Sequence, residues 1–165
     1  MEEARCDAGV SRLLALQNRF YDRVRSRAAR RAAESPATRG SFDSLRGHKY
    51  GLVVTFKRDG TGVPTPIWFG LDDAGRLYFR TGADVAKVRR LRNNPRVLVA
   101  PCTLRGKPLA NSIEGTARVV SVEEKPHAEA TIQANYGLGR RLYERGADSV
   151  GSNEAYVEIV PAGAE

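Results

Sequence analysis

The stretch YGLVVTFKRDGTGVPTPIWFGLDDAGRLYFRT, residues 50–81, decides the fold class of this chain. It holds three segments rich in β-branched and aromatic residues, at 50–56, 63–71 and 76–81. Two polar turns, each containing an Asp and a Gly, separate these segments. Such spacing predicts three strands joined by tight hairpins, and hairpins connect antiparallel neighbours.

The rest of the chain continues this pattern. After the third strand we predict a helix over 84–93, strands over 96–104 and 111–122, helices over 123–136 and 138–145, and a closing strand over 154–160. Thr81 or Asp84 can cap the first of these helices, and Asn93-Asn94-Pro95 ends it. Six strands connected mostly by hairpins predict a mainly β fold with peripheral α-helices, closed as an antiparallel barrel.

Two prolines set the second predicted strand apart. Pro64 and Pro66 each lack the N–H that a central strand donates to its neighbour. Prolines in strands belong at a sheet edge, at a strand end or at a bulge. We therefore expect this strand to have an edge or a face that a ligand approaches, and Trp68 beside the prolines is a candidate wall for a ring system.

Residues 1–41 form a separate N-terminal region, followed by one domain over 42–161. Apolar residues between Val10 and Val24 fall on one stripe of a basic helix, which we expect to end before Pro36. We expect this helix to pack on its own domain or on a second subunit. Binding to a membrane or to a calmodulin-like partner is the alternative.

The composition favours one cytoplasmic domain. The chain has 165 residues, a net charge of +8 and two cysteines, which are too few for a disulfide scaffold. No apolar run reaches the roughly 18–20 residues of a membrane span, and the N-terminus does not resemble a secretory signal. The positive charge favours an anionic partner such as a nucleotide, a phosphate, a polyglutamate chain or nucleic acid.

Motifs for catalysis by side chains are absent from the sequence. His48 and His127 have no metal-ligand spacing around them, and there is no nucleophile elbow, P-loop or dinucleotide-binding glycine motif. We predict no metal site and no catalytic side chain. Any chemistry is expected to be carried by a cofactor.

The segment R-T-G-A-D-V-A-K, residues 80–87, is the strongest candidate for a binding site. The start of a helix offers N–H groups and a positive dipole end, Lys87 lies in its first turn, and Arg80 ends the preceding strand. Together they could neutralise a phosphate, provided that the Asp84 carboxylate points away. The alternative is that both cations are simply solvated.

Nucleic acid is a second candidate partner for the basic cluster in and after this helix, which comprises Lys87, Arg89, Arg90, Arg92 and Arg96. However, the helix lacks the interleaved aromatic residues on which single strands stack. Val and Leu also occupy the positions where a recognition helix has polar readers. The sequence therefore favours an anionic cofactor over nucleic acid.

Three motifs together resemble one known family. They are V-P-T-P-I-W-F (63–69), R-L-Y-F-R-T-G-A-D-V-A-K-V-R-R-L-R-N-N-P-R-V (76–97), and A-P-C (100–102) followed by E-G-T-A-R-V (114–119). They are similar to motifs of the flavin and deazaflavin split β-barrel proteins, the pyridoxamine-phosphate-oxidase-like group. Within that group they resemble the coenzyme F420-dependent oxidoreductases of actinobacteria. The resemblance covers residues 42–161.

The resemblance implies a six-stranded split β-barrel that forms a homodimer, with the cofactor in a groove between the two barrels. It implies hydride transfer from a reduced deazaflavin to a small unsaturated or electrophilic substrate. FMN is the alternative cofactor, and a non-catalytic flavin carrier is the alternative role. By position, the resemblance implies that the ring is lined by Thr65, Pro66, Ile67 and Trp68, with Pro101 and Cys102 near it. It implies that the phosphate is held by Arg80, Thr81 and Lys87, and that Arg92 or Arg58 meets an anionic tail.

Overall fold

The computed structural model describes residues 27–136 and 153–163. In this part of the chain seven strands form one sheet in the order β2-β1-β5-β6-β7-β4-β3, and every neighbouring pair is antiparallel. The strands are β1 (Gly51–Phe56), β2 (Gly62–Ile67), β3 (Gly70–Leu71), β4 (Leu77–Gly82), β5 (Arg96–Pro101), β6 (Ile113–Val119) and β7 (Glu154–Pro161). The helices are α2 (Arg27–Glu34), α3 (Ala86–Asn93) and α4 (Lys125–Tyr136), with a short 3-10 helix η1 (Asp43–Leu45). The predicted mainly β, antiparallel fold is confirmed.

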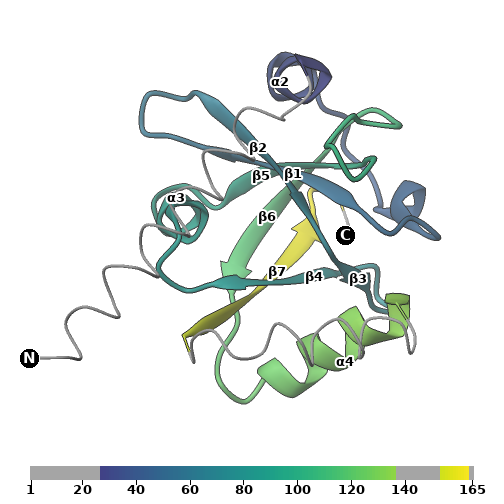
Figure 1. Cartoon of the computed structure of the whole chain (residues 1–165), viewed down its shortest axis with the longest axis vertical. Coiled ribbons are helices and arrows are strands. Elements are labelled where there is room, and N and C mark those ends of the chain that lie inside the picture. Colours follow the sequence, from purple (N-terminus) through teal and green to yellow (C-terminus); the bar gives the residue numbers. More distant parts are fainter. Residues whose placement is uncertain (1–26, 137–152, 164–165) are drawn as a thin grey trace, which may run out of the picture.

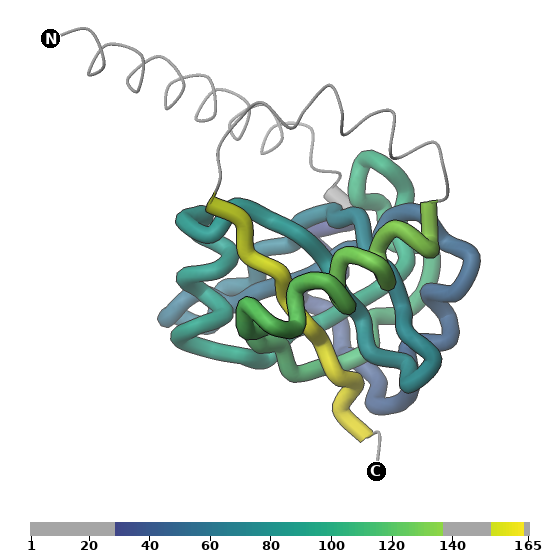
Figure 2. The backbone as a smooth tube through the Cα atoms, turned by 90° about the horizontal axis from the view of Figure 1, so that it is seen from below, coloured from purple at the N-terminus to yellow at the C-terminus, as the bar shows by residue number. Residues whose placement is uncertain are grey.

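The sheet curves into a half-barrel with helices on its outer sides (Figure 1). α2 packs over β2, and α4 packs beneath β3 and β4. α3 lies at one end of the half-barrel, where it contacts β1 and β6. Seen from below, α4 crosses the strand β7 (Figure 2). The inner faces of the strands share one apolar core, which includes Phe42, Phe69 and Phe79, all almost fully buried.

The predicted hairpin turns form where the sequence places them. In the β1–β2 turn, Gly60 has a φ of +82° and its N–H donates to the Lys57 carbonyl at 3.0 Å. In the turn before β4, Gly75 has a φ of +76° and donates to the Asp72 carbonyl at 3.1 Å. A positive φ is costly for residues with a Cβ. These two turns therefore depend on the glycines that made them recognisable in the sequence.

The predicted strand over 63–71 divides into two, so the sheet has seven strands rather than the six expected. β2 ends at Ile67 and pairs with β1, whereas β3 begins at Gly70 and pairs with β4 at the opposite edge of the sheet. Phe69 between them is buried in the core. The chain bends here because one segment must serve both edges. Pro64 and Pro66 lie on the edge strand β2, as their missing N–H groups predicted.

The start of α3 differs from the prediction that Thr81 or Asp84 caps it. The N-cap is Val85, with no side-chain hydrogen bond to the helix, and the Asp84 carboxylate instead accepts a hydrogen bond from Asn153 Nδ2 at 2.7 Å. A neighbouring strand end thus competes for the carboxylate, a contact that local sequence does not reveal. The predicted end of the helix before Pro95 is confirmed.

The N-terminal region reaches the described part of the chain at α2, which ends before Pro36 as predicted. Its residues Ala29 and Ala32 are buried against Leu52 and Cys102 on the outer face of the sheet. The predicted apolar stripe over 10–24 and the helix predicted over 138–145 lie outside the described residues. Within those residues, none of the helices is long and apolar enough to span a bilayer.

A buried carboxylate joins three strands beneath α4. Glu158 on β7 is only 3% exposed and accepts a hydrogen bond from the Tyr78 hydroxyl at 2.9 Å. It also pairs with Arg118 at 2.5 Å and with Arg76 at 3.5 Å. A buried carboxylate needs such partners, because an unpaired buried charge costs several kcal/mol. Burial, followed by the hydrogen bond to Glu158, raises the pKa of Tyr78 well above its ordinary value, so the phenol stays a donor.

The Gly70→Ala substitution tests how closely α4 must approach β3. A Cβ at this position would lie 2.1 Å from the Thr131 carbonyl oxygen in α4, so Gly70→Ala forces backbone atoms apart. We expect Gly70→Ala to lower the free energy of unfolding by about 1–3 kcal/mol, as overpacking does, measured by urea denaturation. In the control Gly82→Ala, the new methyl group meets only Val85 Cγ1, at 3.3 Å. Equal losses in the two variants would contradict the close packing of α4.

Candidate functional site

Trp68 lies at the corner between β2 and β3, where α4 fixes its surroundings. Its ring centroid is 5.5 Å from that of Tyr136, the last residue of α4, at an interplanar angle of 33°. The Tyr136 hydroxyl accepts a hydrogen bond from the Phe69 N–H at 2.9 Å and donates to the Lys49 carbonyl. Asn135 Nδ2 donates to the Phe69 carbonyl at 2.9 Å. The last two residues of α4 therefore hold the corner next to Trp68 through both the N–H and the carbonyl of Phe69.

The predicted ring-lining residues lie at one end of three neighbouring strands. Ile67 on β2 is opposite Gly51 on β1, which is opposite Pro101 on β5. These residues do not share one face, however. Ile67 belongs to the inner core, and Thr65, two positions earlier, shares its side of the strand. Pro66 faces outward, toward Gly106.

Cys102 also faces outward and is covered by α2. It is 3% exposed and packs with Leu52, Ala29 and Ala32. Burial raises the pKa of its thiol to about 12, so the thiol is neutral at physiological pH. Cys102 is thus suited to packing, because only a thiolate is a strong nucleophile.

The residues predicted to hold a phosphate flank the end of β4, on opposite faces of this strand. Arg80 pairs with Glu154 at 3.5 Å and lies opposite Tyr156 in the strand register, on the side that α4 covers. Lys87 is half-buried in the first turn of α3, and its Nζ lies 4.9 Å from the ring centroid of Phe79 on the core side. Lys87 and Thr81 are both half-buried.

A basic cleft lies between the β1–β2 turn and α3, and we call it the hairpin–helix cleft. Its volume is about 490 Å³, and its lining residues are Phe56, Lys57, Arg58, Ala86, Arg89, Arg90, Asn93 and Asn94. Four of these eight residues are cations and none is acidic. Arg58, one of the two candidates for an anionic tail, lines the cleft. Arg92, the other candidate, is exposed on α3 outside this lining.

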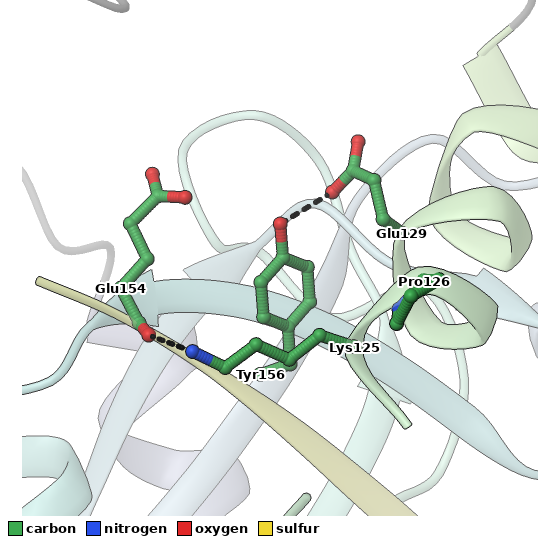
Figure 3. Close-up of a pocket in the computed structure, with 5 residues that line it drawn as sticks. All are labelled: Lys125, Pro126, Glu129, Glu154 and Tyr156. Carbon is green, nitrogen blue, oxygen red and sulfur yellow. Dashed lines mark hydrogen bonds between the residues drawn. The ribbon is translucent and has the colours of Figure 1, made fainter. Parts of the chain in front are cut away.

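A second pocket, of about 330 Å³, lies between α4 and β7 (Figure 3). Tyr156 projects from β7 toward α4 and its hydroxyl donates to Glu129 at 2.9 Å. Burial and this carboxylate raise the pKa of Tyr156 to about 12, so it remains a donor at neutral pH. Glu129 and Glu154 both line this pocket. Two carboxylates make it a poor place for an anion, in contrast to the hairpin–helix cleft.

Metal ligation finds no support in the described ranges. No group of three or more His, Cys, Asp or Glu side chains converges there. His127 lies 3.7 Å from Asp72 and packs edge-on against the ring of Tyr78. One histidine beside one carboxylate does not make a metal site.

Three residues that matter to these sites had no local signal in the sequence. Tyr136 and Asn135 reach residues more than sixty positions earlier in the chain. Thr55, a buried residue of β1, accepts a hydrogen bond from Arg90 Nε at 2.7 Å. Each of these contacts depends on which elements pack together, and neither spacing nor composition reports that.

The sequence pattern of the family described as Pyridoxamine 5'-phosphate oxidase matches residues 40–159. The chain belongs to this family. The matched range includes strands β1 to β6 and nearly all of β7. The architecture is thus the flavin-binding oxidoreductase fold of the pyridoxamine 5'-phosphate oxidase family. No curated protein matches the chain.

Solved structures share this fold at low sequence identity. The conserved hypothetical protein Rv2991 from Mycobacterium tuberculosis is 23% identical over 72% of this chain and 76% of that chain, with a TM-score of 0.54. The heme storage protein HutZ from Vibrio cholerae is 14% identical, with coverages of 69% and 82% and a TM-score of 0.52. A pyridoxamine 5'-phosphate oxidase-related, FMN-binding protein from Nostoc punctiforme is 16% identical, with coverages of 72% and 77% and a TM-score of 0.50. Proteins with these different properties share the fold, so the fold alone does not assign a cofactor.

Tyr136→Phe tests whether α4 fixes the corner that presents Trp68. The substitution keeps the ring but leaves the Phe69 N–H and the Lys49 carbonyl without this hydroxyl partner. We expect a loss of about 1–3 kcal/mol in unfolding free energy, the cost of unpaired polar groups, together with a shift in Trp68 fluorescence. Tyr50→Phe is the control, because Tyr50 packs beside α2 at the edge of a different cluster. An unchanged stability and emission spectrum in Tyr136→Phe would show that the corner is fixed by other contacts.

Proposed function

We propose that this protein is a coenzyme F420-dependent oxidoreductase of the pyridoxamine 5'-phosphate oxidase family. The observation that carries the proposal is the positive charge of α3. This eight-residue helix contains Lys87, Arg89, Arg90 and Arg92 and no acidic residue. F420 carries a phosphate and an oligoglutamate tail, so it is more anionic than FMN and gains more from such a helix.

The side chains present fit an anionic cofactor with an aromatic ring. Lys87 and Thr81 would hold its phosphate, and Trp68 would lie along its ring, with Thr65 on the inner side of β2. Ile67 belongs to the core and Pro66 faces outward, so neither would contact the same face of the ring. Arg58 in the hairpin–helix cleft and Arg92 outside it would meet the tail. Pro101 lies one strand away from the ring-lining segment, across β1. Arg80 is the weakest member of this set, because Glu154 and Tyr156 engage it on the α4 side.

When bound, reduced F420 would supply a hydride to a small unsaturated or electrophilic substrate. The protein would then need only to orient the ring, exclude water and admit a proton. We assign no side chain as proton donor and propose that the proton comes from solvent. The lack of a nucleophilic thiol at Cys102 is consistent with chemistry carried by the cofactor.

We further propose that the active form is a cytoplasmic homodimer, in which the partner subunit completes the pocket over Trp68. Trp68 is only half-buried within one chain, although it is the sole tryptophan and stands at the corner of the barrel. A large aromatic side chain that remains accessible often marks a ligand or subunit contact. Nucleic acid is not favoured, because Phe56, the aromatic residue among the described lining of the hairpin–helix cleft, is only 8% exposed.

FMN is the second candidate cofactor, with a non-catalytic flavin carrier as its simplest role. It is favoured by the FMN-binding protein of Nostoc punctiforme, which shares the fold. A carrier would retain its cofactor tightly and reduce no substrate. An F420-dependent reductase would instead turn over enones or other activated double bonds.

Titration of the purified protein with F420 and, separately, with FMN decides between these cofactors. We expect F420 to quench Trp68 fluorescence with a dissociation constant in the micromolar range or below, and FMN to bind more weakly. Added salt should weaken F420 binding, since screening acts over about 8–10 Å at physiological ionic strength. Preference for FMN would move the protein to the flavin branch, and binding of neither would overturn the proposal.

Lys87→Ala tests the phosphate contact at the start of α3. We expect cofactor binding to weaken by about 1.5–3 kcal/mol, the usual size of a hydrogen bond to a charged group, and Lys87→Arg to keep most of the affinity. Loss of the contact with Phe79 should lower stability by no more than about 1 kcal/mol. Lys107→Ala, on the exposed β5–β6 loop, is the matched control. Equal cofactor affinity in Lys87→Ala and the parent would remove Lys87 from the site.

A further inference from the structure

The hairpin–helix cleft carries charge of one sign on both of its walls. Lys57 and Arg58 come from the β1–β2 turn, and Arg89 and Arg90 come from α3. Arg58 and Arg89 form no ion pair with any described residue. A cleft lined by one sign of charge focuses the field and concentrates counter-ions. The four cations of the lining therefore repel one another, and an anion bound between them would relieve this repulsion.

The acidic groups near the cleft are turned to other partners. Asp59 in the β1–β2 turn accepts a hydrogen bond from the Thr61 N–H at 2.9 Å, and this bond lowers the pKa of its carboxyl. Glu114 pairs with Arg96 at 2.8 Å, and Arg96 is not part of the lining. The Asp59 carboxylate also interacts electrostatically with Lys57, whereas Arg58 and Arg89 form no ion pair with a described residue.

Arg90 is held in position from inside the barrel. Its Nε donates to the hydroxyl of Thr55 at 2.7 Å, and Thr55 is fully buried on β1. A guanidinium already fixed in this way loses less side-chain entropy when a ligand binds. A buried hydroxyl that bonds to a cation at a cleft wall is therefore consistent with a built site rather than with a solvated basic face.

The size and lining of the cleft indicate the class of ligand. A volume of about 490 Å³ is within the usual range for small-molecule sites and exceeds what a single phosphate needs. Cations on two facing elements suit a chain with several anionic groups. The only aromatic lining residue, Phe56, is 8% exposed, and the guanidinium of Arg96 lies 4.8 Å from its ring centroid. A nucleic-acid base therefore has no open ring on which to stack.

We propose that the hairpin–helix cleft binds a polyanionic chain of carboxylates or phosphates, and that Thr55 is a positioning residue that acts through Arg90. The oligoglutamate tail of a cofactor is one source of such a chain, and a polyphosphate is another. The site is defined by residues of the hairpin and of α3 alone. It does not require that the ring-binding assignment be correct.

Isothermal titration of the full-length protein with tetraglutamate peptide and, separately, with inorganic tripolyphosphate tests the site at low ionic strength. Arg89→Gln/Arg90→Gln should weaken binding by at least about tenfold, since each arginine contributes charged hydrogen bonds. Arg105→Gln/Lys107→Gln is the matched control. It removes the same charge from the exposed β5–β6 loop, at the opposite end of β5. We expect it to change the affinity less than twofold, because exposed charges that do not contact the ligand contribute little.

The role of Thr55 is tested by a mutant cycle. Thr55→Val keeps the shape of the side chain but removes the acceptor of Arg90 Nε, and we expect it to weaken binding about threefold, as the loss of preorganisation does. Thr55→Ser should restore the affinity. In the Arg90→Gln background, Thr55→Val should have no further effect, because the two residues act as one unit. A purely structural Thr55 would lower the melting temperature in both backgrounds but show no coupling in affinity.

The outcomes separate the two ligand sources and the two proposals. Binding of tetraglutamate alone indicates a carboxylate chain, binding of tripolyphosphate alone indicates a phosphate chain, and either supports the site. Binding of neither probe, or equal losses in both double variants, overturns it. Neither probe contains a deazaflavin ring. If F420 fails to bind but one of these probes binds, the proposed function is overturned and the cleft proposal stands. If F420 binds but neither probe does, the cleft proposal is overturned and the proposed function stands.

Discussion

The fold depends on one constraint: a single segment of chain supplies both edges of the sheet. β2 pairs at one edge and β3 at the other, and only Trp68 and Phe69 separate them. A flat sheet of seven strands would place its two edges far apart, at roughly 4.8 Å for each strand-to-strand step. The sheet must therefore curve into a half-barrel, and burial of Phe69 at the corner stabilises that curvature. The close contact of Gly70 with α4 holds the same corner from outside.

The same constraint places the half-buried Trp68 and the basic helix at opposite ends of the half-barrel. The corner presents Trp68 at one end of the barrel, beside Tyr136. The other end is left for α3, which bridges β4 and β5 and carries four cations. An aromatic contact thus lies at one end and a positively charged helix at the other.

The distribution of carboxylates decides where an anion can bind. Beneath α4, Glu158 pairs with Arg118 and Arg76, and Asp72 also pairs with Arg76. Arg118 further pairs with Glu124, and this ion pair lowers the pKa of the Glu124 carboxyl to about 2. The acidic side chains are thus concentrated on the α4 side, and two of them line the pocket in Figure 3. On the α3 side, the lining of the hairpin–helix cleft contains four cations and no carboxylate.

The sequence by itself determined the local features: the two glycine turns, the edge position of Pro64 and Pro66, the end of α3 before Pro95 and the end of α2 before Pro36. Each follows from backbone geometry that a single residue imposes, such as a positive φ or a missing N–H. Only the tertiary structure decided where the predicted 63–71 strand bends, which residue begins α3, and that Arg80 and Lys87 lie on opposite faces of β4. Those outcomes depend on contacts between residues far apart in the chain, such as Asn153 with Asp84, Tyr136 with Phe69 and Arg90 with Thr55. Local sequence patterns do not predict such contacts, because they form only when distant elements pack against one another.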